Sequence, residues 1–417
     1  MSTSRKDFLK TLTAGSTISA LSLLTPIDAI FKENLKEKFS SGKLPSRKDY
    51  SLDKNIKYLN HGSTGTIPKI VQEAHQEYLK LCESNPWFYM WSGEWSEPIE
   101  VARNKAAKFI TADVNEISFS HNTTEIFNVL ALGLSLGTND EVLLCNLNHA
   151  GAAIPFHLHS KNLGYSVKTF DIPHEDLSEV TKEGILDLYD QNITSNTKLI
   201  VIPHMDNSFG IRQPVKEITK LARSKGVEFI ALDTAQTMGM IPIDVKDLGV
   251  DVIGTSAHKW IQAPKSISQA YFSKRIQDRI NPMFVTWGQA QWKDTARKFE
   301  DYGTRNLAQI LALGHALDFQ MSIDSKAQET KLKLLWTLAM KLADRSPNTV
   351  WRSPRSWEFS GSLFVIELKI HKPSEFAKQA FMENGYVFRP FDNYSTIRIS
   401  PNLVNTEDEI EGLFRLM

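Results

Sequence analysis

A histidine, an amide, a carboxylate and a lysine each follow an apolar, strand-like segment of this chain. In chain order they are His149, Asn207, Asp233 and Lys259, after segments 141–145, 198–202, 227–232 and 251–254. An amine that is desolvated at the end of a buried strand has a lowered pKa, which frees it for Schiff-base chemistry. A carboxylate beside a ring nitrogen keeps that nitrogen protonated, so the ring can take up electrons from a carbanion.

These four residues need a fold that brings them together. From about residue 101, apolar runs of strand length alternate with amphipathic helical stretches, which indicates an α/β fold with a mainly parallel sheet between helices. Ligands of open parallel sheets bind at the carboxyl ends of the strands. We therefore expect the four side chains to meet at one edge, although any one of them alone could be a helix cap.

A second feature offers a seat for a phosphate group. Residues 121–125 open a helix in which Thr123 and Thr124 stand near backbone N–H groups that lack intrahelical partners. A plain helix cap is the simpler alternative for this segment taken alone. Together with an amine, a carboxylate and a flat stacking ring, it completes the parts that hold pyridoxal 5'-phosphate.

Composition excludes several other classes. The chain has 417 residues, with Lys+Arg and Asp+Glu equal at 48 each, which gives no support to nucleic-acid binding or polybasic membrane attachment. Its two cysteines, Cys82 and Cys145, argue against a disulfide framework or a cysteine-based zinc site, and no metal site is expected. No apolar run after the first thirty residues is long enough to span a bilayer.

The N-terminus is expected to lie outside the fold. Residues 1–29 resemble a twin-arginine-type export signal, with Lys6 in the place of the second arginine. This pattern predicts export to the periplasm, or a cytoplasmic protein if Lys6 disables the signal. Residues 30–57 are charged and polar, and are interpreted as a linker or N-terminal arm.

Three motifs carry a family resemblance: L-N-H-G-S at 59–63, L-D-T-A-Q at 232–236 and S-A-H-K-W at 256–260. They resemble the class V aminotransferase superfamily of fold-type I, pyridoxal-phosphate-dependent enzymes, in its isopenicillin N epimerase-like branch. The match runs in register from about Tyr58 to the C-terminus. It implies a large cofactor-binding domain at 58–310 and a small α+β domain at 311–417.

The resemblance also implies roles for individual residues. Lys259 would form the Schiff base, Asp233 would pair with the pyridine nitrogen, and His149 would stack on the ring. Gln236 or Asn207 would approach the ring hydroxyl. The residues implied to hold the phosphate are Thr123, Thr124, Ser256 and His258.

Substrate and partner contacts are implied in the same way. Arg398, with Asn60 nearby, would grip the carboxylate of an amino-acid-like substrate as a bidentate fork. Thr304, in the D-Y-G-T-R-N stretch at 301–306, would reach the phosphate of a partner subunit, which implies a homodimer. The chain departs from many relatives at 263–268, where it lacks a glycine-rich turn.

The reaction type stays open at this point. Desulfurases that work through a persulfide need a thiol on a loop well after the lysine, but both cysteines precede Lys259. An epimerase or racemase, a transaminase and a cysteine-independent β-lyase all remain. If the chain were a non-catalytic protein that keeps the fold, we would expect its cofactor-binding residues to be replaced, and none of them is. A hydrolase built on Gly62-Ser63 lacks the G-x-S-x-G motif.

Overall fold

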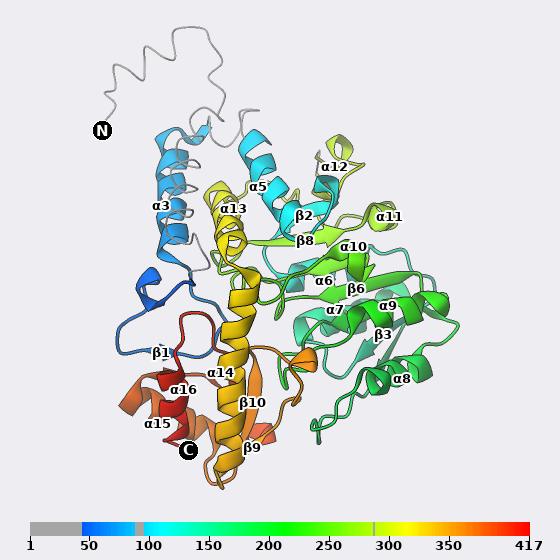
Figure 1. Ribbon diagram of the computed structural model, residues 1–417. Helices are drawn as coiled ribbons and strands as arrows, with labels where there is room; N and C mark the ends of the chain where they lie inside the picture. The colour runs from blue at the N-terminus through cyan, green and yellow to red at the C-terminus, as the bar shows by residue number, and fades with distance from the viewer. Residues whose placement is uncertain (1–43, 88–95, 287) are drawn as a thin grey trace, which may run out of the picture.

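The computed structural model describes residues 44–87, 96–286 and 288–417 (Figure 1). The proposed export signal at 1–29 lies outside the described residues. Among the helices that are described, none is both long and apolar enough to cross a membrane.

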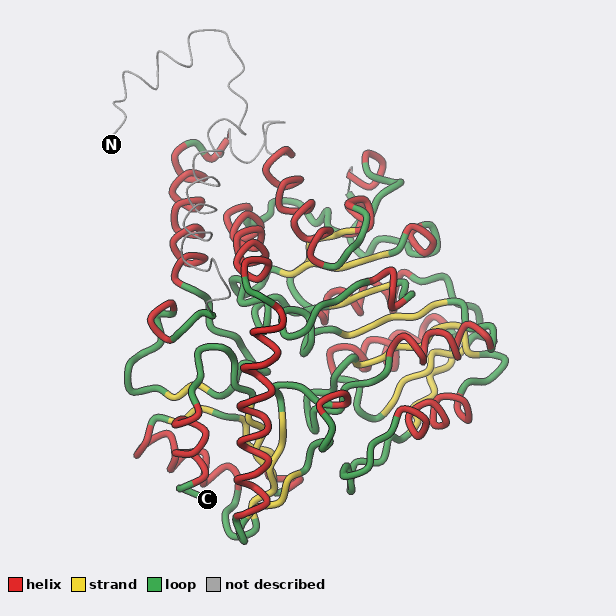
Figure 2. The backbone as a smooth tube through the Cα atoms, in the orientation of Figure 1, coloured by secondary structure: helices red, strands yellow, loops and turns green. Residues whose placement is uncertain are grey.

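A seven-stranded sheet forms the centre of the larger part of the molecule (Figure 2). Its strands run in the order β2-β8-β7-β6-β5-β3-β4, and all neighbouring pairs are parallel except β2 with β8 and β7 with β8. The bounds are β2 Ile117–Ser120, β3 Glu141–Cys145, β4 Ser166–Phe170, β5 Thr197–Pro203, β6 Phe229–Asp233, β7 Val252–Gly254 and β8 Ser268–Phe272. The predicted α/β class with a mainly parallel sheet is confirmed.

Apolar runs bury the central strands β3, β5 and β6 on both faces. In β5, Leu199 and Val201 belong to one apolar cluster, whereas Ile200 and Ile202 belong to another. Successive side chains of a strand point to opposite faces, so the sheet separates two cores. The helices of the large part are α3 Lys69–Ser84, α5 Ser96–Phe109, α6 Thr123–Gly133, α7 Ala150–Leu163, α8 Lys182–Asn192, α9 Val215–Ser224, α10 Val245–Leu248, α11 Lys274–Gln277, α12 Gly288–Gln291 and α13 Leu307–Ser322.

A smaller antiparallel sheet follows toward the C-terminus. Its order is β12-β13-β10-β9, with bounds β9 Thr349–Trp351, β10 Phe364–Leu368, β12 Arg389–Phe391 and β13 Thr396–Ile399. Helices α14 Ser325–Arg345, α15 Pro373–Asn384 and α16 Glu407–Phe414 accompany it (Figure 1). The proposed boundary at 310/311 falls inside α13, which packs on α3 and α5, and the division into two domains stays a prediction.

One crossover ties the start of the described chain to this smaller part. Strand β1 Lys57–Tyr58 pairs in parallel with β11 Tyr386–Val387, and a bridge joins Asn60 to Ser400. The 60–65 segment is thereby laid beside the end of β13. Gly65 fits there because a Cβ on it would lie 1.9 Å from the carbonyl oxygen of Lys259. Two segments distant in sequence therefore meet at the lysine.

Candidate active site

Two adjoining cavities open at the carboxyl ends of β5, β6 and β7. The inner one reaches Asp233 and has a volume of about 40 Å³, and the outer one reaches Arg398 and has a volume of about 370 Å³. Residues that line both cavities are Thr124, His149, Asn207, Gln236, Ser256 and Lys259. Lys259 therefore stands on a wall that faces a carboxylate on one side and a guanidinium on the other.

The electrostatics around Lys259 favour a reactive amine. Desolvation is the main effect that lowers its pKa, to about 8; Asp233 opposes this shift and Arg398 adds to it. Asp233 is 6% exposed, and burial raises the pKa of its carboxyl group. One carboxylate oxygen of Asp233 accepts the Ala235 N–H at 2.9 Å, and the other accepts no hydrogen bond from a described residue. That second oxygen is free to accept a ring N–H.

The two histidines of the site are held neutral. His149 caps α7, where its Nδ1 accepts the Gly151 N–H at 3.0 Å. Its pKa is lowered mainly by burial and, to a smaller extent, by the positive charge of Lys259. The pKa of His258 is also lowered, to about 4, mainly by burial and then by the positive charge of Lys259. A neutral ring loses less on desolvation than an imidazolium does, which suits His149 to a stacking position.

The start of α6, predicted to hold a phosphate group, lies at the inner cavity. Asn122 caps the helix by accepting the Glu125 N–H at 3.1 Å, and the first-turn residues Thr123 and Thr124 line the inner cavity. The hydroxyls of Thr123 and Ser256 lie 2.8 Å apart and join this helix to the segment that carries the lysine. A Cβ on Gly151 would lie 2.5 Å from Thr124 Oγ1, so α7 begins directly against the seat.

The two residues proposed for the ring hydroxyl differ in availability. Gln236 donates to the Gly62 carbonyl at 2.9 Å and accepts the Trp260 indole N–H at 3.0 Å. Its amide therefore fastens the 62–65 segment to the lysine segment. The side-chain amide of Asn207 makes no hydrogen bond within the described part of the chain, which leaves it the freer of the two.

Arg398 is buried and held at the outer cavity. Its guanidinium donates to the Asn207 carbonyl at 2.9 Å, to Asn60 Oδ1 at 3.2 Å and to Ser63 Oγ at 2.5 Å. Its Nε is buried and has no partner among the described residues. The pKa of Arg398 is lowered to about 10, mainly by burial and then by the positive charge of Arg389. The group is fixed, charged and incompletely neutralised, as a carboxylate site requires.

Not every expected residue lines these cavities. Thr304 is exposed and lines neither of them, and its neighbour Tyr302 packs on His121 with 4.8 Å between ring centroids. The outer cavity is also lined by Ser63, Arg389 and Phe391, which were not predicted from the sequence. The only signal for the two later residues was their alternation within a strand close before Arg398.

The residues present fit pyridoxal phosphate. A free carboxylate oxygen, a lysine of lowered pKa, a neutral ring and a helix N-terminus border the same space. When bound, the cofactor would supply the electron sink, held by Asp233 at the ring nitrogen and by α6 at the phosphate.

Comparison with known proteins identifies the family of this chain. The model of the class V aminotransferase family matches residues 57–413, so the chain belongs to that family. It is a pyridoxal-phosphate-dependent enzyme of fold type I.

Relatives within the family carry different activities. A probable cysteine desulfurase of Pyrococcus abyssi is 25% identical over 391 residues, covering 88% of this chain and 94% of the relative. The isopenicillin N epimerase of Streptomyces clavuligerus is 23% identical over 381 residues, covering 87% and 94%. A solved complex of the cystine C-S lyase C-DES with cysteine persulfide has a TM-score of 0.79 at 21% identity, covering 87% and 97%. These proteins thus share a fold with this chain but catalyse different reactions.

Proposed function

We propose that this enzyme moves a proton at the α carbon of an amino-acid-like substrate, as an epimerase or aminotransferase of class V does. The observation that supports it best is the position of Lys259 between Asp233 and Arg398. A substrate whose carboxylate lies on Arg398 has its α carbon between that guanidinium and the lysine. An amine with a pKa of about 8 can take and return a proton near neutral pH.

The chain's own residues divide the remaining work. Arg398 orients the substrate through its carboxylate, and Asn60 and Ser63 orient the guanidinium. Asp233 would hold the protonated ring nitrogen of the bound cofactor, and Thr123, Thr124 and Ser256 would hold its phosphate. The Gln236 contacts with Gly62 and Trp260 keep the substrate side and the lysine side in register.

The position of the thiols argues against a persulfide route. Sulfur transfer of that kind needs an accessible thiolate. Cys145 is buried in β3, where burial raises its pKa to about 12, and Cys82 lies on α3, where burial raises its pKa to about 11. Neither lines the two cavities. A β-lyase that needs no cysteine is the second candidate, because its first step is the same removal of the α proton.

The deciding experiment follows Cα hydrogen exchange in D₂O across a panel of amino acids, with product chirality and keto-acid release measured together. Exchange with inversion supports an epimerase, and exchange with transfer of the amino group supports a transaminase. Release of pyruvate and ammonia from β-substituted substrates supports the lyase. Absence of exchange with every amino acid in the panel would contradict the proposal, with Lys259→Ala as the blank.

The proposal includes a homodimer. Support comes from Thr304, which is exposed in a loop next to the start of α6 and lines neither cavity of its own chain. Sedimentation of the holoenzyme should give twice the chain mass. Mixing Lys259→Ala with Thr304→Ala subunits should then restore some activity if sites are shared, and a monomer with full activity would contradict it.

Export is proposed on the basis of residues 4–10 alone, with Lys6 as the departure from the signal pattern. Fractionation of cells that carry the native N-terminus should place the protein in the periplasm. Replacing Arg5 and Lys6 by glutamine should retain it in the cytoplasm. A wholly cytoplasmic pool of the native form would end this part of the proposal.

A further inference from the structure

A second guanidinium stands beside the substrate carboxylate site. Arg389 on β12 is the register partner of Arg398 on β13, so the two side chains lie on the same face of the small sheet. Both line the outer cavity, and so does Phe391, two residues further along β12. The cavity mouth therefore carries two arginines around one aromatic ring.

This pair conflicts with ordinary sheet energetics. Like charges directly opposite each other on antiparallel strands are destabilising. The Phe391 ring offsets part of that repulsion, because the guanidinium carbons of Arg389 and Arg398 lie 5.7 and 5.9 Å from its centroid. Departures from local rules of this kind concentrate at functional sites.

The acidic groups nearby do not neutralise Arg389. Within the described part of the chain, Arg389 forms no ion pair or hydrogen bond with a carboxylate. Asp206 contributes to the field at Arg398, but its oxygens are occupied by the N–H groups of Ser208, Phe209 and Ile211. The other carboxylate, Asp233, lines the inner cavity only. One positive charge at the mouth is left without a protein partner.

We propose that the substrate is an amino acid with a second anionic group, whose α-carboxylate binds Arg398 and whose side-chain anion binds Arg389. This rests on the proposed function, since it assumes that Arg398 takes the α-carboxylate. The volume of about 370 Å³ leaves room for a side chain that extends from Lys259 to the β12 edge. Arg389 then acts as a specificity residue, and its exposure lets it meet a side-chain anion at the entrance.

The test measures binding to the holoenzyme, by calorimetry and by the near-visible absorption of the bound cofactor. Ligands are the isosteric pairs aspartate with asparagine and glutamate with glutamine, and 2-aminoadipate extends the acid series. The wild type should bind the best acid about ten-fold more tightly than its amide, because a charge-assisted hydrogen bond is lost with the amide. Arg389→Gln should remove that preference by weakening the acid much more than the amide.

Two further variants sharpen the test. Arg398→Gln should weaken the acid and the amide equally, and Arg355→Gln, a surface arginine of the small part paired with Asp344, should change neither. Equal binding of acids and amides by the wild type would overturn the inference, as would an Arg389→Gln variant that weakens both alike. If borohydride fixes the cofactor on Lys259 and acids are not preferred, only this inference fails. If no cofactor is fixed there, the proposed function fails and takes this inference with it.

Discussion

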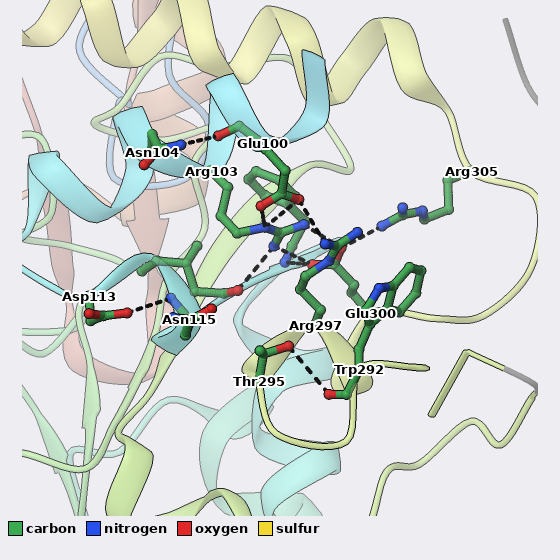
Figure 3. Close-up of polar contacts among 12 residues, drawn as sticks. Glu100, Arg103, Asn104, Asp113, Asn115, Trp292, Thr295, Arg297, Glu300 and Arg305 are labelled. Carbon is green, nitrogen blue, oxygen red and sulfur yellow. Dashed lines mark hydrogen bonds and ion pairs between the residues drawn. The ribbon is translucent and has the colours of Figure 1, made fainter. Parts of the chain in front are cut away.

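Two regions of the molecule bury charged groups in opposite ways. Around Glu300, two glutamates and three arginines pair with one another in a largely buried cluster (Figure 3). Around Lys259, charged groups are only partly satisfied and face an open cavity. The contrast separates charge that stabilises the fold from charge reserved for a ligand.

The Glu300 cluster is complete without a ligand. Arg103 donates two hydrogen bonds to Glu300, at 2.7 and 2.8 Å, and Arg305 and the Phe119 N–H donate at 2.8 and 2.7 Å (Figure 3). Burial by itself raises the pKa of Glu300, but Arg103 and Arg305 outweigh it and lower the pKa to about 2. The cluster fastens α5 to the 300–305 loop, so it supports the position of Thr304.

The active-site groups show the reverse balance. Desolvation lowers the pKa of Lys259 to about 8 and that of Arg398 to about 10, and it raises the pKa of Asp233. Each shift disfavours the charged form that a complete set of partners would favour. Stability is sacrificed here so that a cofactor and a substrate can supply the missing partners.

The largest expected effect comes from breaking the complete cluster. Glu300→Gln removes the fully buried carboxylate that Arg103 and Arg305 share, and leaves Arg103 only the partly exposed Glu100 as a countercharge. This should cost about 3–5 kcal/mol of unfolding free energy. Denaturant unfolding measures the loss. Arg355→Gln, which breaks an exposed pair with Asp344, should cost less than about 1 kcal/mol. Equal losses of unfolding free energy in the two variants would contradict the distinction between buried and surface ion pairs.

Low pH should reduce the stabilisation of the fold by the Glu300 carboxylate. Because the pKa of Glu300 is about 2 in the folded chain against an ordinary 4.5, its carboxylate adds stability above pH 4.5. That stability is lost as the pH falls from 4.5 toward 2. The difference in unfolding free energy between wild type and Glu300→Gln should therefore narrow over this window. A constant difference would show that the charge of Glu300 is not what stabilises the fold.

A pair of aspartates sharpens the comparison through activity. Asp233→Asn removes the carboxylate that we propose keeps the ring nitrogen protonated, and should lower kcat by about 10²–10³ while the protein stays folded. Asp251→Asn is the matched control, since Asp251 is buried but paired with Arg223 and Arg275. It should lower the melting temperature and leave kcat of the folded enzyme unchanged. A large loss of kcat in Asp251→Asn with none in Asp233→Asn would contradict these assignments.

The smallest effect is a gain. Lys259→Met in the cofactor-free protein replaces a half-buried amine of lowered pKa with an apolar side chain of similar length. It should raise the unfolding free energy by about 1 kcal/mol, as is common when a catalytic group is removed. Calorimetric melting of both cofactor-free forms measures this. A clear loss of stability would mean that Lys259 is a structural residue.

Much of the inner site could be predicted from sequence because it depends on local rules. β6 ends at Asp233 and β7 at Gly254, and parallel strands present their carboxyl ends at one edge. The helix that starts at Thr123 was also marked by its cap. Apolar runs and caps are legible within a few residues, so the side chains that follow them can be placed.

The rest depends on contacts between distant segments. Arg389 gains meaning only through its pairing with β13, and Ser63 only because β1 joins β11. Nothing near Glu300 in the sequence distinguishes it from a solvated glutamate, since its partner Arg103 lies 197 residues away. Burial of a charge is decided by tertiary packing, which local patterns do not report.

The central claim is that the Lys259 amine carries the cofactor beside Asp233. The most direct measurement is borohydride reduction of the purified enzyme, followed by mass spectrometry of its peptides. A pyridoxyl group should be fixed on the peptide that contains Lys259, and the near-visible absorption should be lost in Lys259→Ala. A label on any other lysine, or an undiminished absorption in that variant, would contradict the account.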